Sequence, residues 1–347
     1  MTSVSITPKG PFSLAASLRF LEDFTPASYD HAADGVLRLA FPADDGVHVI
    51  GCAVRQKETA GPTPAAVTAD ITVHHGDTTL TAGSGTDHHR AARAQLARIL
   101  SLDVDGTGFP ALADADPVVA GLQADWPGLR PVCFHSPYEA AVWAVIGNRI
   151  RMSQAAAIKA RLARDHGQAV QVAGEELHAF PAPGVLRRLD RVEGLSDTKL
   201  ERLRALSEAA LDGGLDAATL RDQPVESALT ELQGLPGIGP FSAGLVLIRG
   251  AGHPDVFPAV EPRLHRAMAT QYGLDAATAG DPARLARLAT AWRPYRSWVA
   301  LLLRARAQDS ASRGAGDRSA RPRAPSPNLP EQTPVASVDP AVSWATR

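Results

Sequence analysis

The feature that most constrains this chain is a short glycine hairpin between two helical stretches. It spans Leu235–Ala243 and reads LPGIGPFSA. Glycine lets the backbone turn tightly, proline restricts the dihedral angles, and the helix that follows starts with unpaired amides. Such a helix start can bind a phosphate closely, which points to DNA; the alternative is a corner between two helices without a ligand. The residues expected to contact DNA phosphate here are Gly237, Gly239, Phe241 and Ser242.

A second motif follows the hairpin and carries a carboxylate. The segment Asp255–Ala267 is a turn that opens a helix, and Glu261 lies near the start of that helix. A carboxylate in this place can stabilise a developing positive charge or orient a water molecule. It can equally serve the helix alone, because an acidic residue favours the helix dipole and caps free amides. The sequence leaves both roles of Glu261 open.

Composition and charge limit the class of protein. The chain has 347 residues, of which 45% are hydrophobic, which is enough for two or three domains. It has no charged-then-apolar leader and no apolar run of about 18 residues, so we expect a cytoplasmic, nucleoid-associated protein without a membrane partner. Cys52 and Cys133 are isolated, which argues against a disulfide framework, a zinc knuckle or an iron–sulfur cluster. Because the net charge is −2, any DNA contact must come from a local basic face or from backbone amides.

The spacing of apolar residues divides the chain into three parts and predicts an α+β fold. Alternating residues, separated by Asp/Gly and Pro/Gly turns, predict an antiparallel sheet domain over residues 1–86. The strands are expected near 36–41, 47–54 and 66–73. From His88 the apolar residues recur at three-and-four spacing, which predicts a helical domain over 87–306 with its helix-hairpin-helix near 232–252. Residues 307–347 are rich in Ser, Ala, Pro and Arg without periodicity, so we expect a disordered tail.

Two helix boundaries within the helical part are well marked. Ser136 can cap a helix that begins with Pro137 and closes a capping box with Glu139, and this helix is expected to run to Arg149. A second helix is expected over 153–166, where a glycine follows.

Taken together, these segments resemble the helix-hairpin-helix DNA glycosylase superfamily, and within it the bacterial inducible 3-methyladenine DNA glycosylase family. The resemblance covers roughly residues 5–305. Besides the hairpin and the acidic turn, it rests on Leu102–Asp105, Ala144–Asn148, Gly194–Lys199 and Trp292–Ser297. It implies a monomeric base-excision repair enzyme without a cofactor, which flips a damaged purine out of double-stranded DNA and hydrolyses the N-glycosidic bond. Relatives that also cleave the backbone carry a lysine at the position of Phe241, so the resemblance implies a monofunctional enzyme.

The sequence departs from the family at the catalytic position. Glu261 stands where the resemblance implies an aspartate. The additional methylene moves the carboxylate by about 1 Å, and a misplacement of that size can lower the rate about a hundredfold. The alternative function is therefore a catalytically weak or inactive relative that binds damaged or distorted DNA.

The residues expected to line the pocket for the flipped base are Phe241, Leu245, Tyr138, Trp143 and Arg304. Phe241 can stack on a base, and Arg304 can stack through its planar guanidinium but would repel a cationic methylated base. The alternative for Arg304 is a solvent-facing position on the last helix. For Trp143 and for Trp298 the alternative is packing in the core.

Basic residues flank the two turns and can supply the local positive face. Lys199 matches a motif position of the family and is expected to bind phosphate. The others are Arg202, Arg263, His265 and Arg266. The eleven histidines show no metal-ligand spacing, so we expect no catalytic metal. The resemblance implies only a structural monovalent cation at the carbonyl groups of Gln233, Leu235 and Ile238.

Overall fold

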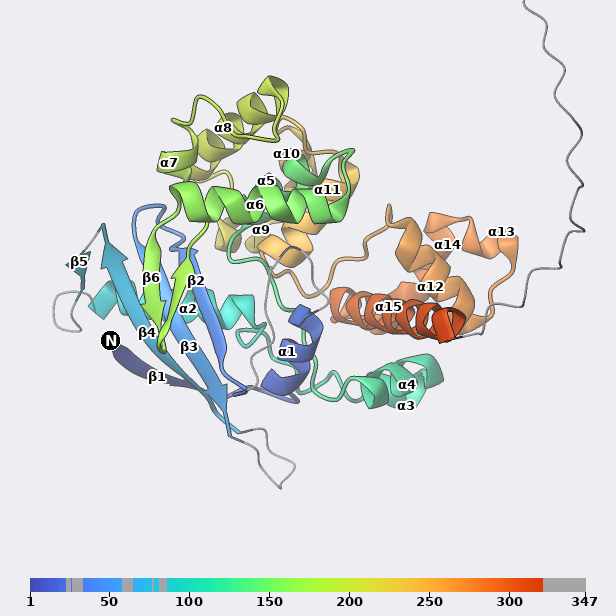
Figure 1. Cartoon of the computed structure of the whole chain (residues 1–347). Helices are drawn as coiled ribbons and strands as arrows, with labels where there is room; N and C mark the ends of the chain where they lie inside the picture. Colours follow the sequence, from blue (N-terminus) through green and yellow to red (C-terminus); the bar gives the residue numbers. More distant parts are fainter. Residues whose placement is uncertain (23–25, 27–33, 58–64, 77, 81–85, 321–347) are drawn as a thin grey trace, which may run out of the picture. The chain divides into compact units, whose positions relative to one another are not determined.

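An antiparallel sheet forms from the alternating segments of the amino-terminal part. The computed structural model describes residues 1–22, 26, 34–57, 65–76, 78–80 and 86–320, without the side chains of 86 and 311–320. The strands are β1 (Thr2–Ile6), β2 (Leu37–Pro42), β3 (Val49–Gln56), β4 (Val67–His75) and β5 (Thr78–Thr79). Their order is β1-β4-β3-β2, with β5 beside β4. The strand order can be followed in Figure 1, and the register pairs Leu39 with Cys52 and Cys52 with Ile71. The predicted α+β class is confirmed, and β1 is a strand that the sequence analysis missed.

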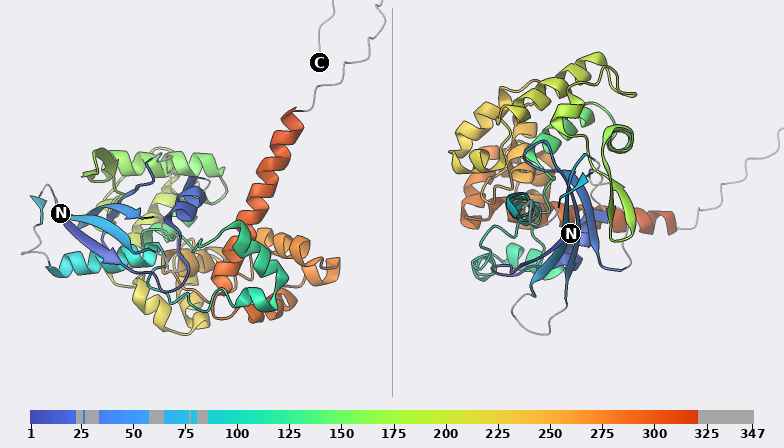
Figure 2. Two further views of the ribbon diagram at one scale, coloured as in Figure 1. Left: turned by 90° about the horizontal axis from the view of Figure 1, so that it is seen from below. Right: turned by 90° about the vertical axis from the view of Figure 1, so that its left-hand side faces the viewer.

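Each face of this sheet is covered by a different element. Helices α1 (Leu14–Glu22) and α2 (Thr86–Ile99) supply apolar side chains to one face, where the core continues to Val132. The hairpin of β6 (Ala169–Val172) and β7 (Glu175–His178) covers part of the other face, as Figure 2 shows.

The β6–β7 hairpin falls in a region that the sequence predicts to be helical. Its approach depends on Gly51 of β3, since a Cβ atom there would lie 3.1 Å from a methyl group of Val172. The strands have only four residues each, so their alternation is too short to be recognised without the sheet that they cover.

The rest of the described chain is helical and forms two further cores. The first surrounds α5 (Pro137–Gly147) and the second surrounds the start of α15 (Arg296–Ala320). In Figure 1 the first group lies in the upper part of the view and α12 to α15 of the second group lie at the right. The first group comprises α5, α6 (Met152–His166), α7 (Pro183–Leu186), α8 (Asp197–Leu211), α9 (Ala217–Asp222), α10 (Val225–Gln233), α11 (Pro240–Leu245) and the π-helix η2 (Val246–Gly250). The second comprises α3 (Leu112–Ala115), α4 (Pro117–Asp125), α12 (Pro262–Tyr272), α13 (Ala276–Ala279), α14 (Pro282–Leu288), the 3-10 helix η3 (Ala289–Trp292) and α15.

Local signals set the helix ends much as expected. The Ser136 hydroxyl accepts a hydrogen bond from the Glu139 amide (3.1 Å), so α5 starts as predicted but ends at Gly147. Helix α6 ends at His166, and Gly167 is required there because a Cβ atom would lie 1.8 Å from the Ala179 carbonyl oxygen.

One buried arginine joins the sheet to the helices of the first group. Arg98, on α2, donates to the Gly250 carbonyl at the end of η2 (2.6 Å) and to the His135 carbonyl (2.9 Å). It also binds both carboxylate oxygens of Asp44, in the turn between β2 and β3, at 2.9 Å each. Residues on both sides of the predicted domain boundary at residue 86 are therefore in direct contact through Arg98.

The chain forms two compact units, 1–308 and 309–347. Helix α15 continues past Ala307 to Ala320, so the first part of the segment 307–347, predicted to be a disordered tail, is helical. Residues 321–347 lie outside the described residues. None of the described helices has the length and apolar character needed to cross a membrane.

The start of α5 contains a buried ion cluster that should dominate local stability. Glu139 is 3% exposed, and its two carboxylate oxygens meet Lys159 (2.6 Å) and His135 (2.8 Å). Burial acts to raise the pKa of Glu139, but the charges of His135 and Lys159 outweigh it and hold that pKa well below its usual range. The stabilisation is thus present above the unfolded pKa of about 4.3 and is lost as the pH falls through the depressed folded value.

Replacing Glu139 by alanine is expected to destabilise the protein by about 3–5 kcal/mol, because Lys159 would remain buried without its carboxylate. Urea unfolding at neutral pH measures this loss. The matched control is Glu193→Ala. It removes the exposed carboxylate that pairs with Arg161 of α6, and it should change stability by less than about 1 kcal/mol. Equal effects of the two substitutions would contradict the buried-cluster interpretation.

Candidate functional site

The glycine hairpin has the geometry expected for phosphate binding. Gly237 has φ +87°, and a Cβ atom there would lie 2.8 Å from Arg202, so only glycine fits. Gly239 faces open space, because a Cβ atom added there would meet nothing within 4 Å. The backbone bonds of α11 begin with Ala243 N to Gly239 O (2.9 Å), so the earlier amides of this helix have no partner in the preceding turn. The turn thus presents its free amides beside an open glycine.

A basic cavity of about 670 Å³ lies beside the hairpin. It is lined by Asn148, Arg149, Ile150, Gly194, Ser196, Thr198, Lys199, Arg202 and Gly237. Three of these side chains are cationic and none is acidic. The cavity is therefore a locally basic surface on a protein whose net charge is −2. Arg149 was missed as a site residue because the sequence predicts it inside a helix, whereas it lies after α5 with φ +57°.

Lys199 has a more structural position than expected. Its ammonium group donates to the carbonyl oxygens of Ile146 and Asn148, both at 2.8 Å, and so caps the end of α5. Partial burial, with repulsion from Arg202, lowers the pKa of Lys199. Two of its three donors are therefore used inside the protein, which leaves one for a ligand in the cavity.

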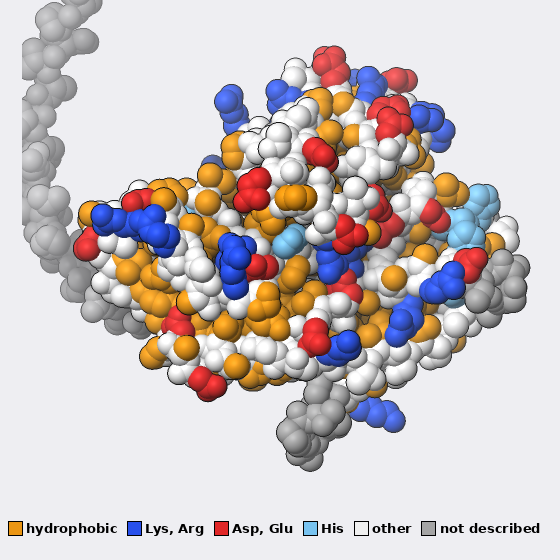
Figure 3. Space-filling view, turned by 180° about the vertical axis from the view of Figure 1, so that it is seen from behind, with side chains coloured by type: hydrophobic (Ala, Val, Ile, Leu, Met, Phe, Trp, Pro, Cys, Tyr) orange, Lys and Arg blue, Asp and Glu red, His pale blue; other side chains and the backbone are white. Residues whose placement is uncertain are grey.

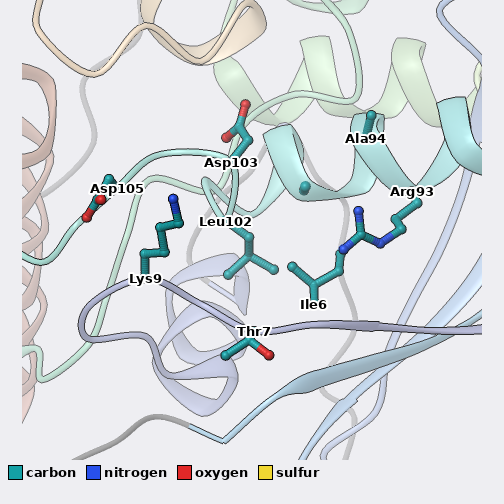
Figure 4. Close-up of a pocket in the computed structure, with 9 residues that line it drawn as sticks. Ile6, Thr7, Lys9, Arg93, Ala94, Leu102, Asp103 and Asp105 are labelled. Atoms are coloured by element: carbon teal, nitrogen blue, oxygen red, sulfur yellow. The ribbon is translucent and has the colours of Figure 1, made fainter.

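A second hollow, between the end of β1 and α2, differs in charge. Figure 4 shows Lys9 and Arg93 among its lining together with Asp103 and Asp105. Its volume is about 410 Å³. The two cations are balanced by two carboxylates, so this hollow lacks the uniform positive charge of the cavity beside the hairpin.

Glu261 precedes α12 but does not cap it. The side chain accepts no hydrogen bond from the first amides of the helix, and only the Glu261 carbonyl is used, by His265 N (3.1 Å). The carboxylate instead forms an ion pair with Nη1 of Arg304, with the two side chains 17% and 28% exposed. The capping role that the sequence left open for Glu261 is therefore not the one in the structure.

Helix α15 holds the loop that carries Glu261. In its first turn Arg296 binds Asp255 through two contacts, at 2.7 and 3.0 Å, and the Ser297 hydroxyl accepts from Val256 N (3.0 Å). Two turns further along the same helix, Arg304 reaches Glu261. One rigid element thus fixes both ends of the loop, which is how a carboxylate is held in place for chemistry.

A second arginine adds positive charge next to this pair. Burial lowers the pKa of Arg249 to about 10, with Cys133 acting against this shift and Arg304 adding to it. Arg249 also donates to the Val132 carbonyl (3.1 Å). Burial likewise lowers the pKa of Arg304. The Glu261–Arg304 pair therefore lies in a partly buried, electropositive environment.

The residues predicted to line the base pocket differ in burial. Tyr138 and Trp143 are 4% and 5% exposed in the core around α5, and the Tyr138 hydroxyl donates to the Pro181 carbonyl (3.2 Å). Both side chains pack in this core, and their part in a base pocket stays a prediction. Leu245 is partly buried against the same core, and Phe241 is 51% exposed.

The remaining predicted residues lie in different surroundings. Trp298 is buried in the second helical core, and the His265 ring stacks on Phe257 with centroids 6.4 Å apart. In the hairpin, the Leu235 carbonyl accepts from Ile238 N (3.1 Å), which uses one of its lone pairs. The monovalent cation at Gln233, Leu235 and Ile238 stays a prediction.

Comparison with known proteins gives the following similarities. No protein-family model matches the chain. It is 30% identical over 216 residues to the "Probable bifunctional transcriptional activator/DNA repair enzyme AlkA" of Mycobacterium tuberculosis, a match covering 60% of this chain and 41% of that protein. It is 32% identical over 186 residues to the DNA-3-methyladenine glycosylase 2 of Escherichia coli, covering 52% and 61%. The chain thus spans less than two thirds of the length of either relative.

The fold has a counterpart among solved structures. The 3-methyladenine DNA glycosylase from Archaeoglobus fulgidus superposes with a TM-score of 0.66 at 21% identity, covering 88% of this chain and 98% of that one. At this identity the likeness is one of fold, and function must be argued from the site.

Proposed function

We propose that this chain belongs to the helix-hairpin-helix DNA glycosylase superfamily and hydrolyses the N-glycosidic bond of alkylated or otherwise damaged purines in double-stranded DNA. The observation that carries this proposal is the state of Glu261: its carboxylate leaves the helix amides uncapped and is held instead by Arg304. A carboxylate fixed in this way is not used to cap the helix, so it can interact with a substrate.

The main task of the catalyst is to stabilise the positive charge that develops on the sugar. As the glycosidic bond stretches, the deoxyribose gains oxocarbenium character, which an ionised carboxylate stabilises while it orients the attacking water. Glu261 supplies this charge, and Arg304 fixes its position. The guanidinium also weakens the attraction of the site for a cationic methylated base, so neutral damaged purines should be accepted as well.

DNA is bound by the hairpin and the basic cavity together. The amides of Phe241 and Ser242 and the open side of Gly239 receive a backbone phosphate, and Arg149 and Arg202 attract the strand nearby. Phe241 has no amine to form a Schiff base, so we propose a monofunctional enzyme. Such an enzyme would act as a monomer at the chromosomal DNA.

A second candidate function is damage recognition without cleavage. It is favoured by the same ion pair, because Arg304 partly neutralises the charge that the transition state requires. This protein would bind distorted DNA through the hairpin and release no base.

The decisive experiment is incubation of the purified protein with duplex oligonucleotides that carry 3-methyladenine, 7-methylguanine, ethenoadenine or hypoxanthine, followed by alkali. We expect strand cleavage at one or more lesions after alkali and none before it, as for a monofunctional glycosylase. Undamaged duplex is the control. Binding of every lesion without an abasic product would favour the recognition function, and cleavage without alkali would contradict monofunctionality.

A further inference from the structure

We propose that Asp45, His48 and His88 form a binding site for a divalent transition-metal ion of the zinc class. The site lies on the sheet side of the molecule and is independent of the proposed glycosylase function. The histidine count alone did not reveal it, because the ligands come from separate segments without a metal-binding spacing.

Two elements bring the three side chains together. Asp45 and His48 lie in the turn between β2 and β3, and His88 lies in the first turn of α2. The turn is closed by hydrogen bonds from Ala43 N to His48 O (2.8 Å) and from Gly46 N to Ala43 O (3.0 Å). Figure 3 shows histidine side chains gathered at one edge of the molecule. The ligands are therefore placed by backbone structure.

The donor atoms converge on one point. Asp45 Oδ2 lies 2.7 Å from Nδ1 of His48 and 3.9 Å from Nδ1 of His88. One ligand atom from each of the three residues can be chosen so that all lie within 4.8 Å of one another. Around a tetrahedral zinc ion with ligand bonds of about 2.0–2.2 Å, neighbouring ligand atoms are about 3.3 Å apart. Small side-chain rotations thus suffice to seat an ion.

The carboxylate is already oriented for this role. Its other oxygen, Oδ1, accepts hydrogen bonds from the amides of Val47 and His48, both at 2.9 Å. Outer hydrogen bonds of this kind fix a ligand in place and strengthen metal binding. Asp44 is not a further ligand, because both of its oxygens bind Arg98.

The ligand set selects the class of metal. Two imidazoles and one carboxylate suit zinc, cobalt, nickel or copper, whereas magnesium and calcium prefer oxygen ligands alone. The His75 ring, at the end of β4, lies 5.2 Å from the His48 ring and is a nearby source of a fourth ligand. The side chains of His88 and Asp45 are 42% and 41% exposed, so the ion can enter from solvent. A bound ion would tie the β2–β3 turn to α2.

Calorimetric titration of the full-length, untagged, EDTA-treated protein with zinc chloride tests this site. We expect one saturable site per chain, no binding of magnesium, and loss of affinity of about tenfold or more in His88→Ala and in His48→Gln. The matched control is His166→Ala, an exposed histidine in the last turn of α6, which should bind zinc as the unchanged protein does.

Two further readouts separate a built site from nonspecific adsorption. Cobalt(II) should give the visible absorption of a low-symmetry, four- or five-coordinate ion, and zinc at a hundred times Kd should raise Tm by about 4 °C, reversed by EDTA. Absence of saturable binding, or equal affinity in His88→Ala and the unchanged protein, would overturn the proposal. Neither result bears on glycosylase activity, which is measured separately.

Discussion

Replacement of Glu261 by glutamine is expected to lower the rate of base excision by about a hundred- to a thousandfold and to leave DNA affinity within about twofold. The amide keeps the size of the side chain but removes the charge that stabilises the oxocarbenium-like sugar. Single-turnover excision and fluorescence anisotropy on the same lesion-containing duplex measure the two effects. Because the carboxylate does not cap α12, the start of this helix should be unaffected.

Two variants make this experiment specific. Glu226→Gln changes an exposed glutamate in the first turn of α10 in the same way and should excise at the normal rate. Glu261→Asp keeps the charge but withdraws it from Arg304, so it tests the length of the side chain separately from its ionisation. Unchanged excision in Glu261→Gln would remove Glu261 from the mechanism.

Gly239→Asp is expected to weaken binding of duplex DNA by about ten- to a hundredfold. The new carboxylate would stand where the phosphate approaches the hairpin amides, and like charges at about 4 Å repel by about 1–4 kcal/mol between water and a protein surface. The backbone at Gly239 is extended and a Cβ atom meets nothing within 4 Å, so the fold should tolerate the change. Gly237 is unsuitable for this test, because its φ of +87° and its contact with Arg202 would confound binding with folding.

The controls separate charge at the hairpin from charge elsewhere. Gly239→Asn has nearly the same shape without the charge and should lose much less affinity. Gly184→Asp adds one negative charge on α7, where a Cβ atom also meets nothing, and should bind as the unchanged protein does. If Gly239→Asp binds DNA normally at several salt concentrations, the hairpin is not a phosphate site.

Most of the fold could be predicted because local signals in the sequence determine it. Ser136, Gly167 and the hairpin glycines act through their own backbone and nearest neighbours, so their helix ends and turns could be predicted. The strands over 36–54 show their alternation within a single segment. By contrast, β6 and β7 pack against β2 and β3, far away in the chain, and their own residues carry too short a pattern.

The site was harder to predict than the fold, because its contacts are long-range. The hairpin residues and Glu261 were recognisable, but the partner of Glu261 comes from α15. Tyr138 and Trp143 lie on a helix that is buried on nearly all sides, so its spacing does not distinguish a pocket face from a core face. Arg149 enters the basic cavity only because α5 ends early.

The anchoring of η2 by Arg98 limits how far this protein can be made smaller. The helical segment that starts at the hairpin ends on the Gly250 carbonyl, and that carbonyl is held from α2, which belongs to the core beneath the sheet. A minimal fragment built from the helices alone would lose Asp44 and leave the guanidinium of Arg98 without its counter-ion. A shortened form of this protein should therefore retain the amino-terminal sheet, which supports the end of the segment that follows the hairpin.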